Sequence, residues 1–121
     1  MSGYRGLKVW QDSVALAKQV YLDTESFPKT QLYSLTQQMQ RAAVSIASNI
    51  AEGHNRNSTK EYIHFLGIAL GSAGELETQY FIAADIGFIE HPRASERLEL
   101  ISEIARMLRA VIKTLQKQIA A

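Results

Sequence analysis

The chain contains no cysteine, only two prolines and 8% aromatic residues among its 121 residues. The lack of cysteine excludes disulfide bonds, thiolate metal ligands and a cysteine nucleophile, and it is compatible with a reducing compartment. No apolar run approaches the roughly 20 residues that span a bilayer, and the first residues lack the apolar segment of a signal peptide. We therefore expect a soluble, cytoplasmic protein with no membrane partner.

Opposite charges are nearly balanced, with 13 basic and 12 acidic residues and a net charge of +1. No global field would draw in nucleic acid, so any attraction must come from local clustering. The 46% of hydrophobic residues and the 21% of charged residues are typical of a globular protein. We predict a single domain over residues 1–121, with a loose N-terminal arm at residues 1–6.

Apolar residues recur at alternating steps of three and four, which is the spacing of one helix face. The first such stretch runs from Leu7 to Glu25 and ends before Pro28. The stripe expected to face the core consists of Leu7, Trp10, Val14, Ala17, Tyr21 and Thr24. The second stretch begins at a capping box, Ser34 to Gln37, and is expected to end at Gly53 in a left-handed cap.

Two further helical stretches complete the chain. A second capping box, Ser58 to Glu61, begins a helix that is expected to end at Gly87. Pro92 suits the first turn of the last helix, which continues toward the C-terminus. No strand-like alternation is present. The prediction is an all-α, antiparallel, up-down-up-down four-helix bundle.

Glycines recur along one side of the third predicted helix at Gly67, Gly71 and Gly74. Each should cost about 1 kcal/mol relative to alanine in a helix interior. We expect the close approach of a neighbouring helix to offset this cost. A backbone contact to a ligand or to a second subunit is the open alternative.

Four segments carry a family resemblance: residues 7–11 (LKVWQ), 38–53 (QMQRAAVSIASNIAEG), 61–66 (EYIHFL) and 69–77 (ALGSAGELE). Over residues 7–87 the chain resembles the bacterial four-helix-bundle proteins encoded in 23S rRNA intervening sequences. This resemblance implies a homopentamer. It extends to the accessory proteins of diversity-generating retroelements, which implies a reverse transcriptase and nucleic acid as candidate partners.

Polar residues at helical spacing accompany the apolar face of segment 38–53. The residues that match the polar motif of the family, with their expected partners, are Arg41, Ser45, Asn49, Glu52, Arg56, Glu61, Ser72 and Glu75. In an antiparallel hairpin, Asn49 should lie level with Glu61, and Arg41 with residues 69–72. Polar groups between helices must be hydrogen-bonded. We expect a structural network at a helix seam or subunit interface, with ligand contact or catalysis as the alternatives.

No motif for catalysis is complete. Glu61 and His64 have the spacing of half a ferritin-like di-metal site, but the other helices offer no second half. The sequence has no Gly-x-Ser-x-Gly elbow, no phosphate-binding glycine loop and no His-Glu-x-x-His motif. We predict no enzyme activity, no catalytic residue, no metal site and no cofactor.

Positive charge gathers near the C-terminus. Arg106, Arg109, Lys113 and Lys117 follow steps of three, four and four, and no acid occurs after Glu103. A solvated face that complements the helix dipole is one reading. The other is a candidate nucleic-acid-binding surface for RNA or DNA, repeated in each subunit of an oligomer and based on phosphate contact.

Apolar residues also lie outside the main stripes of the last two helices. They are Ile63, Ile68, Phe81, Ile82, Leu100 and Met107. One bundle of this size can bury only one stripe per helix, so the surplus indicates self-association. The leading hypothesis is a non-enzymatic, homo-oligomeric bundle that associates with nucleic acid or ribonucleoprotein. The alternative is a protein-interaction scaffold or accessory subunit, for example for a reverse transcriptase, without direct nucleic-acid binding.

Overall fold

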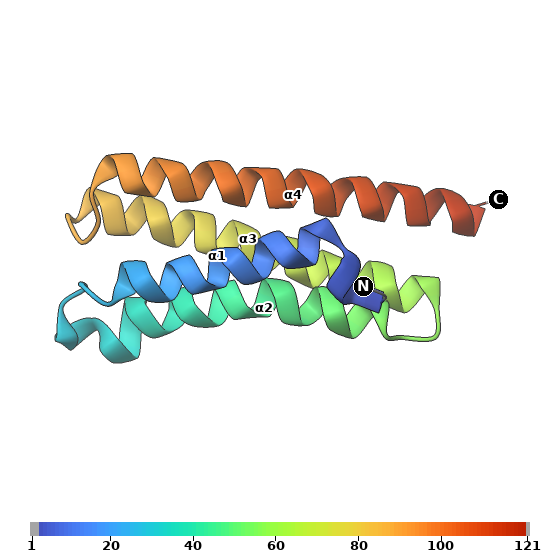
Figure 1. Cartoon of the computed structure of the whole chain (residues 1–121), viewed down its shortest axis with the longest axis horizontal. Coiled ribbons are helices and arrows are strands. Elements are labelled where there is room, and N and C mark those ends of the chain that lie inside the picture. The colour runs from blue at the N-terminus through green and yellow to red at the C-terminus, as the bar shows by residue number, and fades with distance from the viewer. Residues whose placement is uncertain (1–2, 121) are drawn as a thin grey trace.

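The computed structural model describes residues 3–120, which fold into four long helices. These are α1 (Lys8–Thr24), α2 (Gln37–His54), α3 (Thr59–Asp85) and α4 (His91–Ala120). Successive helices run in opposite directions along one long axis (Figure 1). The described residues contain no strand. The predicted all-α four-helix bundle is confirmed.

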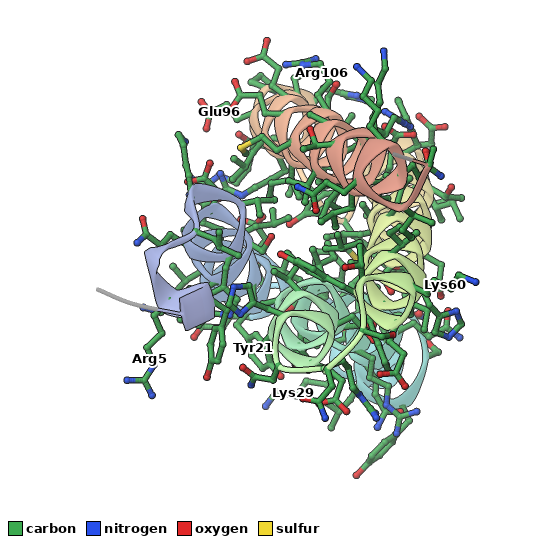
Figure 2. All side chains as sticks on the ribbon, turned by 90° about the vertical axis from the view of Figure 1, so that its right-hand side faces the viewer. Arg5, Tyr21, Lys29, Lys60, Glu96 and Arg106 are labelled. Atoms are coloured by element: carbon green, nitrogen blue, oxygen red, sulfur yellow. The ribbon has the colours of Figure 1, made fainter. Side chains whose placement is uncertain are left out.

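A single apolar core fills the space between the helices. Seen along the bundle axis, α1, α2, α3 and α4 follow one another around this core (Figure 2). α3 packs against both α2 and α4, whereas α1 packs mainly against α2. The large side chains that are fully buried are Leu16, Val20, Met39, Ile46, Ile50, Leu66, Leu76, Tyr80, Ile101, Ile104 and Leu108.

The core face of α1 differs from the predicted one. The buried residues of α1 are Val9, Ser13, Leu16, Val20, Asp23 and Thr24. In the predicted stripe, Thr24 is buried as expected, but Val14 and Ala17 are only half-buried and Tyr21 is 48% exposed. Two neighbouring stripes of α1 are apolar at helical spacing, and the one through Val9, Leu16 and Val20 faces the centre of the core. Of the predicted stripe, Tyr21 remains on the surface, whereas Leu7, Trp10 and Ala17 pack at the edge of the core.

The start of α2 is also displaced from its prediction. A π-helical turn, Leu32–Thr36, precedes α2, and Ser34 within it has the non-helical angles φ −126° and ψ −106°. The Ser34 hydroxyl donates to Gln31 Oε1 at 2.7 Å. Because this local side-chain bond replaces the expected cap, the predicted capping box does not form.

Gly53 lies inside α2 and does not end it in a left-handed conformation, because positive φ angles in residues 3–120 occur only at Gly3 and Gly87. A Cβ atom at Gly53 would lie 2.8 Å from Phe65 Cβ and 3.1 Å from Tyr62 Cδ1. The predicted helix-ending role is therefore wrong. Gly53 instead permits the start of α3 to approach the end of α2.

Both predicted ends of α3 are confirmed. Ser58 Oγ accepts a hydrogen bond from the Glu61 backbone N–H at 3.1 Å. At the other end Gly87 has φ +82°, its N–H donates to Ala84 O at 3.2 Å, and Phe88 N–H donates to Ala83 O at 2.9 Å. This pair of bonds is a Schellman motif, which requires a residue that tolerates the left-handed region.

The predicted loose arm, residues 1–6, is partly folded. Residues 1–2 lie outside the described part. Residues Gly3–Gly6 form a 3₁₀ turn whose Tyr4 ring packs edge-on against Trp10, with 5.2 Å between ring centroids. Gln11 Nε2 also donates to Arg5 O at 2.8 Å. These contacts attach the arm to the first turns of α1.

The glycines of α3 do not receive a neighbouring helix within the subunit. Gly67, Gly71 and Gly74 are exposed, and a Cβ atom at any of them would meet nothing within 4 Å. The predicted close approach is therefore wrong for the isolated chain. The alternative, a contact outside the subunit, keeps its physical basis because these residues leave the backbone of α3 open to approach.

Candidate functional site

The predicted basic residues form one continuous, exposed face of α4. Arg106, Arg109, Lys113 and Lys117 are all exposed, and Figure 2 shows Arg106 on the outer side of the bundle. Arg106 Nη1 donates to Ser102 Oγ at 3.1 Å. Within residues 3–120 none of the four takes part in an ion pair. Their charge is therefore not neutralised by neighbouring acids.

A cation from α1 adjoins this face. Lys8, Glu103, Arg106 and Met107 line a hollow of about 450 Å³ between the start of α1 and α4. Lys8 Nζ lies 2.6 Å from Asp12 Oδ2. This hydrogen bond, together with the negative charge of Asp12, raises the pKa of Lys8 and keeps it protonated. Lys8 was not predicted because it comes from a different helix.

The polar motif residues of α2 form a small hydrogen-bonded group at the α2–α3 seam. Ser45 Oγ and Ser72 Oγ lie 2.8 Å apart. Asn49 Nδ2 donates to Ser45 Oγ at 2.9 Å and to Ser45 O at 2.8 Å. Ser72 is buried, so its hydroxyl requires such a partner. The Ser45–Ser72 bond joins α2 to α3 at one register, and Asn49 supports Ser45 from within α2.

The remaining members of the predicted network lie elsewhere. Arg56 Nη2 lies 2.7 Å from Glu52 Oε1 on the surface, and the guanidinium group stands 4.9 Å from the centre of the Phe65 ring. The Glu61 side chain is exposed near the start of α3. The predicted level of Asn49 with Glu61 is wrong by about two helical turns, since Ser45 opposes Ser72 and Asn49 therefore lies level with about residue 68.

Arg41 and Glu75 frame a polar hollow beside this group. Together with Gln38, Ser45 and Ser72 they line a volume of about 500 Å³. Both charged side chains are exposed, and neither forms an ion pair in the described part of the chain. The arrangement can therefore offer one charge of each sign to a polar partner.

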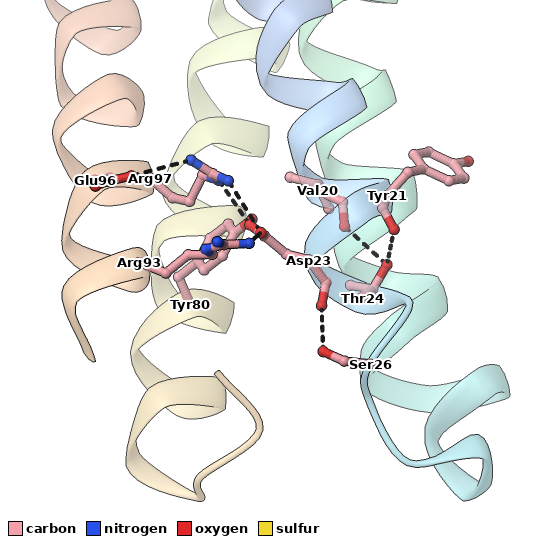
Figure 3. A network of polar contacts seen from close by, with 9 residues as sticks. All are labelled: Val20, Tyr21, Asp23, Thr24, Ser26, Tyr80, Arg93, Glu96 and Arg97. Atoms are coloured by element: carbon pink, nitrogen blue, oxygen red, sulfur yellow. Dashed lines mark hydrogen bonds and ion pairs between the residues drawn. The ribbon is translucent and has the colours of Figure 1, made fainter. Parts of the chain in front are cut away.

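A buried carboxylate that sequence reasoning missed joins three helices (Figure 3). Asp23, 4% exposed, accepts a hydrogen bond from Tyr80 Oη at 2.7 Å on its Oδ2 atom. Arg97 donates from Nε at 2.8 Å and from Nη2 at 3.1 Å, one bond to each carboxylate oxygen. Arg93 Nη1 lies 3.6 Å from Oδ1. Burial first, and then the bond to Asp23, raise the pKa of Tyr80.

One signal in the sequence could have revealed this cluster. Leu16, Val20 and Asp23 follow steps of four and three, so an acid continues a core-facing stripe. A buried acid requires a basic partner. Arg93 and Arg97, one turn apart at the start of α4, meet that requirement.

Two further observations limit the chemistry of the described residues. In residues 3–120, no three potential ligands among His, Cys, Asp and Glu are grouped so that they could hold a metal ion. Each described helix is too short or too polar to traverse a bilayer.

The fold and the motif residues place the chain among proteins built as a single four-helix bundle. The sequence profile of the 23S rRNA-intervening sequence protein family matches residues 5–110, and the chain belongs to that family. Arg106 and Arg109 lie within the matched range, and Lys113 and Lys117 lie beyond it. No curated protein matches the chain.

A solved structure supports the same fold. It is the crystal structure of a protein of unknown function from the S23 ribosomal protein family of Bacteroides thetaiotaomicron. The two chains share 24% sequence identity with a TM-score of 0.79, over 87% of this chain and 98% of that chain. The similarity extends over nearly the whole bundle.

Proposed function

We propose that the protein is a non-enzymatic, homo-oligomeric bundle of the cytoplasm that associates with nucleic acid or ribonucleoprotein through the basic face of α4. The observation that carries this proposal is the absence of ion pairs at Arg106, Arg109, Lys113 and Lys117 among the described residues. Unpaired cations on one helix face can each neutralise a phosphate and release its counterion. Such binding needs no base-specific contact.

Oligomerisation would strengthen this binding, because each added subunit repeats the stripe. The resemblance to the intervening-sequence proteins implies a pentamer. Exposed apolar side chains on α1 and α3, such as Tyr21, Leu22, Phe81 and Ile82, support self-association. A single stripe carries a modest charge, whereas several stripes on one particle produce a strong local field.

Titration of fluorescently labelled single-stranded and hairpin RNA at about 50 mM and about 200 mM salt tests the proposal. We expect binding at the lower salt concentration that weakens strongly at the higher one. A double substitution, Arg109→Gln with Lys113→Gln, should reduce the affinity. Lys29→Gln with Lys60→Gln is the matched control, because it removes two exposed cations from other parts of the surface. Absence of binding at the lower salt concentration, or equal losses in both variants, would contradict the proposal.

A second candidate function is an accessory subunit that docks a protein, such as a reverse transcriptase, without contacting nucleic acid. The polar hollow framed by Arg41 and Glu75 favours it, because both charges are exposed and unpaired in the described residues. A protein partner that stays bound after nuclease treatment, and that is lost on Arg41→Glu substitution, would support this function.

A further inference from the structure

The polar hollow framed by Arg41 and Glu75 is placed by the register of α2 against α3. Ser45 and Ser72 stand opposite each other, with 2.8 Å between their hydroxyl oxygens. Arg41 lies one turn before Ser45 on α2, and Glu75 lies three residues after Ser72 on α3. Because the two helices run antiparallel (Figure 1), both charged residues are displaced in the same direction along the seam, by about 6 Å and about 4.5 Å. They therefore approach one hollow from its two sides.

Small side chains form the floor of the polar hollow. Ala42 and Ser72, which are 5% and 7% exposed, line it together with Ser45. Gln38, three residues before Arg41 on α2, contributes an exposed amide group at one end. The volume of about 500 Å³ is within the range of sites for small molecules. The polar hollow is therefore large enough for a ligand of the size of an amino acid.

The two serine hydroxyls of the polar hollow have one hydrogen that the protein does not use. Each hydroxyl carries one hydrogen, and the bond between Ser45 and Ser72 takes only one of the two. The bonds from Asn49 are donated to Ser45, so they do not use the second hydrogen. Among residues 3–120 neither hydroxyl forms any other hydrogen bond. One serine hydroxyl is therefore available to donate to a bound molecule.

The two charges of the polar hollow select the kind of molecule that fits it. The planar guanidinium group of Arg41 can hold a carboxylate through two parallel hydrogen bonds. The carboxylate of Glu75 can accept hydrogen bonds from an ammonium group. A simple anion is attracted by Arg41 but repelled by Glu75, and a simple cation meets the reverse. The polar hollow thus favours a molecule that carries both charges.

We infer that the polar hollow binds a free α-amino acid in its zwitterionic form. Arg41 and the available serine hydroxyl hold the carboxylate of the ligand, and Glu75 holds its ammonium group. A side-chain amide on the ligand reaches Gln38, whose own amide offers both donors and an acceptor. L-glutamine meets all these requirements. The inference goes beyond the second candidate function, which assigns a protein to the same hollow.

Three ligands test whether both charges of the ligand are needed. They are L-glutamine, N-acetyl-L-glutamine, which lacks the ammonium charge, and L-glutaminamide, which lacks the carboxylate charge. Isothermal titration calorimetry on the full chain, without nucleic acid or a partner protein, measures the affinity for each. We expect L-glutamine to bind with a Kd of about 1 mM or lower, and each analogue to bind at least about 10-fold more weakly.

Two substitutions test the charged residues of the polar hollow. Arg41→Gln and Glu75→Gln each remove one charge from an exposed side chain, so the fold should persist, which circular dichroism reports. Each should weaken the binding of L-glutamine by about 10-fold or more. Lys18→Gln and Glu77→Gln are the matched controls, because they remove exposed charges that do not line the polar hollow. Both controls should bind L-glutamine as the wild-type protein does.

The Glu75→Gln variant offers one further check. It no longer repels an anion, so N-acetyl-L-glutamine should bind to it as tightly as L-glutamine does. Three results would overturn the inference: no binding of L-glutamine at about 10 mM, equal affinity of the wild-type protein for all three ligands, or an affinity that Arg41→Gln leaves unchanged. Because the measurement contains neither nucleic acid nor a partner protein, its failure is distinct from a failure of the proposed function.

Discussion

The hydroxyl of Tyr80 in α3 donates a 2.7 Å hydrogen bond to the carboxylate of Asp23 in α1, two residues separated by 57 positions in sequence. Arg97 adds two bonds from α4, so one buried carboxylate connects three of the helices. Desolvation of such a charge is expensive unless every lone pair has a partner. The cluster therefore fixes how the ends of α1, α3 and α4 meet.

Loss of the Arg97 guanidinium group should destabilise the protein strongly. Its side chain is 12% exposed, and Arg97→Gln would leave Asp23 as a buried charge with weaker partners. We expect a loss of about 3–5 kcal/mol in the free energy of unfolding, measured by urea denaturation. Arg56→Gln, which breaks the exposed pair with Glu52, should cost less than about 1 kcal/mol. Equal losses of unfolding free energy in the two variants would show that the buried cluster stabilises the protein no more than an exposed ion pair does.

The buried hydroxyl of Tyr80 should make stability depend on alkaline pH. In the unfolded chain it ionises near its ordinary pKa of 10.0, whereas burial and the bond to Asp23 raise the pKa in the folded protein. Above pH 10 the folded state retains a proton that the unfolded state has lost. The stabilising contribution is therefore complete below pH 10 and declines above it, by up to about 1.4 kcal/mol per pH unit.

Tyr80→Phe should reduce this decline, measured by urea denaturation from about pH 8 to about pH 11. The variant should also be less stable at neutral pH by about 1.5–3 kcal/mol, because it lacks a hydrogen bond to a charged group. Tyr33→Phe controls for the substitution itself, since Tyr33 is 85% exposed. A wild-type pH dependence in Tyr80→Phe would exclude this hydroxyl as its source.

Two glycine substitutions should have opposite effects on subunit stability. Gly53→Ala would place its Cβ 2.8 Å from Phe65 Cβ, so the start of α3 must shift, and we expect a net loss of about 1–3 kcal/mol. Gly71→Ala meets nothing within 4 Å and should gain about 0.5–1 kcal/mol from helix propensity. Denaturation at several protein concentrations separates this effect from association. A stabilising Gly53→Ala would refute the close packing.

The comparison of the predicted and observed core face of α1 shows what hydrophobic periodicity can establish. Helical spacing identified the helices, because steps of three and four persist over many residues. It did not identify the core face of α1, because an apolar stripe through Leu16 and Val20 lies beside another through Val14 and Tyr21. Only the positions of the other helices decide which stripe is buried. The choice is therefore a tertiary property.

The polar sites were predictable to different degrees. The basic face of α4 follows from spacing within one helix, so the sequence places its residues together. The bond between Ser45 and Ser72 joins two helices, and a shift of one turn suffices to change the partner. Asp23, Tyr80 and Arg97 are farther apart in sequence, and no local pattern brings them together. Predictability declines as more helices contribute to a site.

The salt dependence of the RNA-binding constant should report how many phosphates α4 contacts. For single strands the logarithm of the binding constant falls with the logarithm of salt concentration by about 0.7 per neutralised phosphate. If Arg109 and Lys113 each contact one phosphate, Arg109→Gln with Lys113→Gln should reduce the slope by about 1.4 for every bound subunit, that is, 2 × 0.7. The control pair Lys29→Gln and Lys60→Gln should leave the slope unchanged. A weaker affinity with an unchanged slope would mean that these two residues do not contact the phosphates.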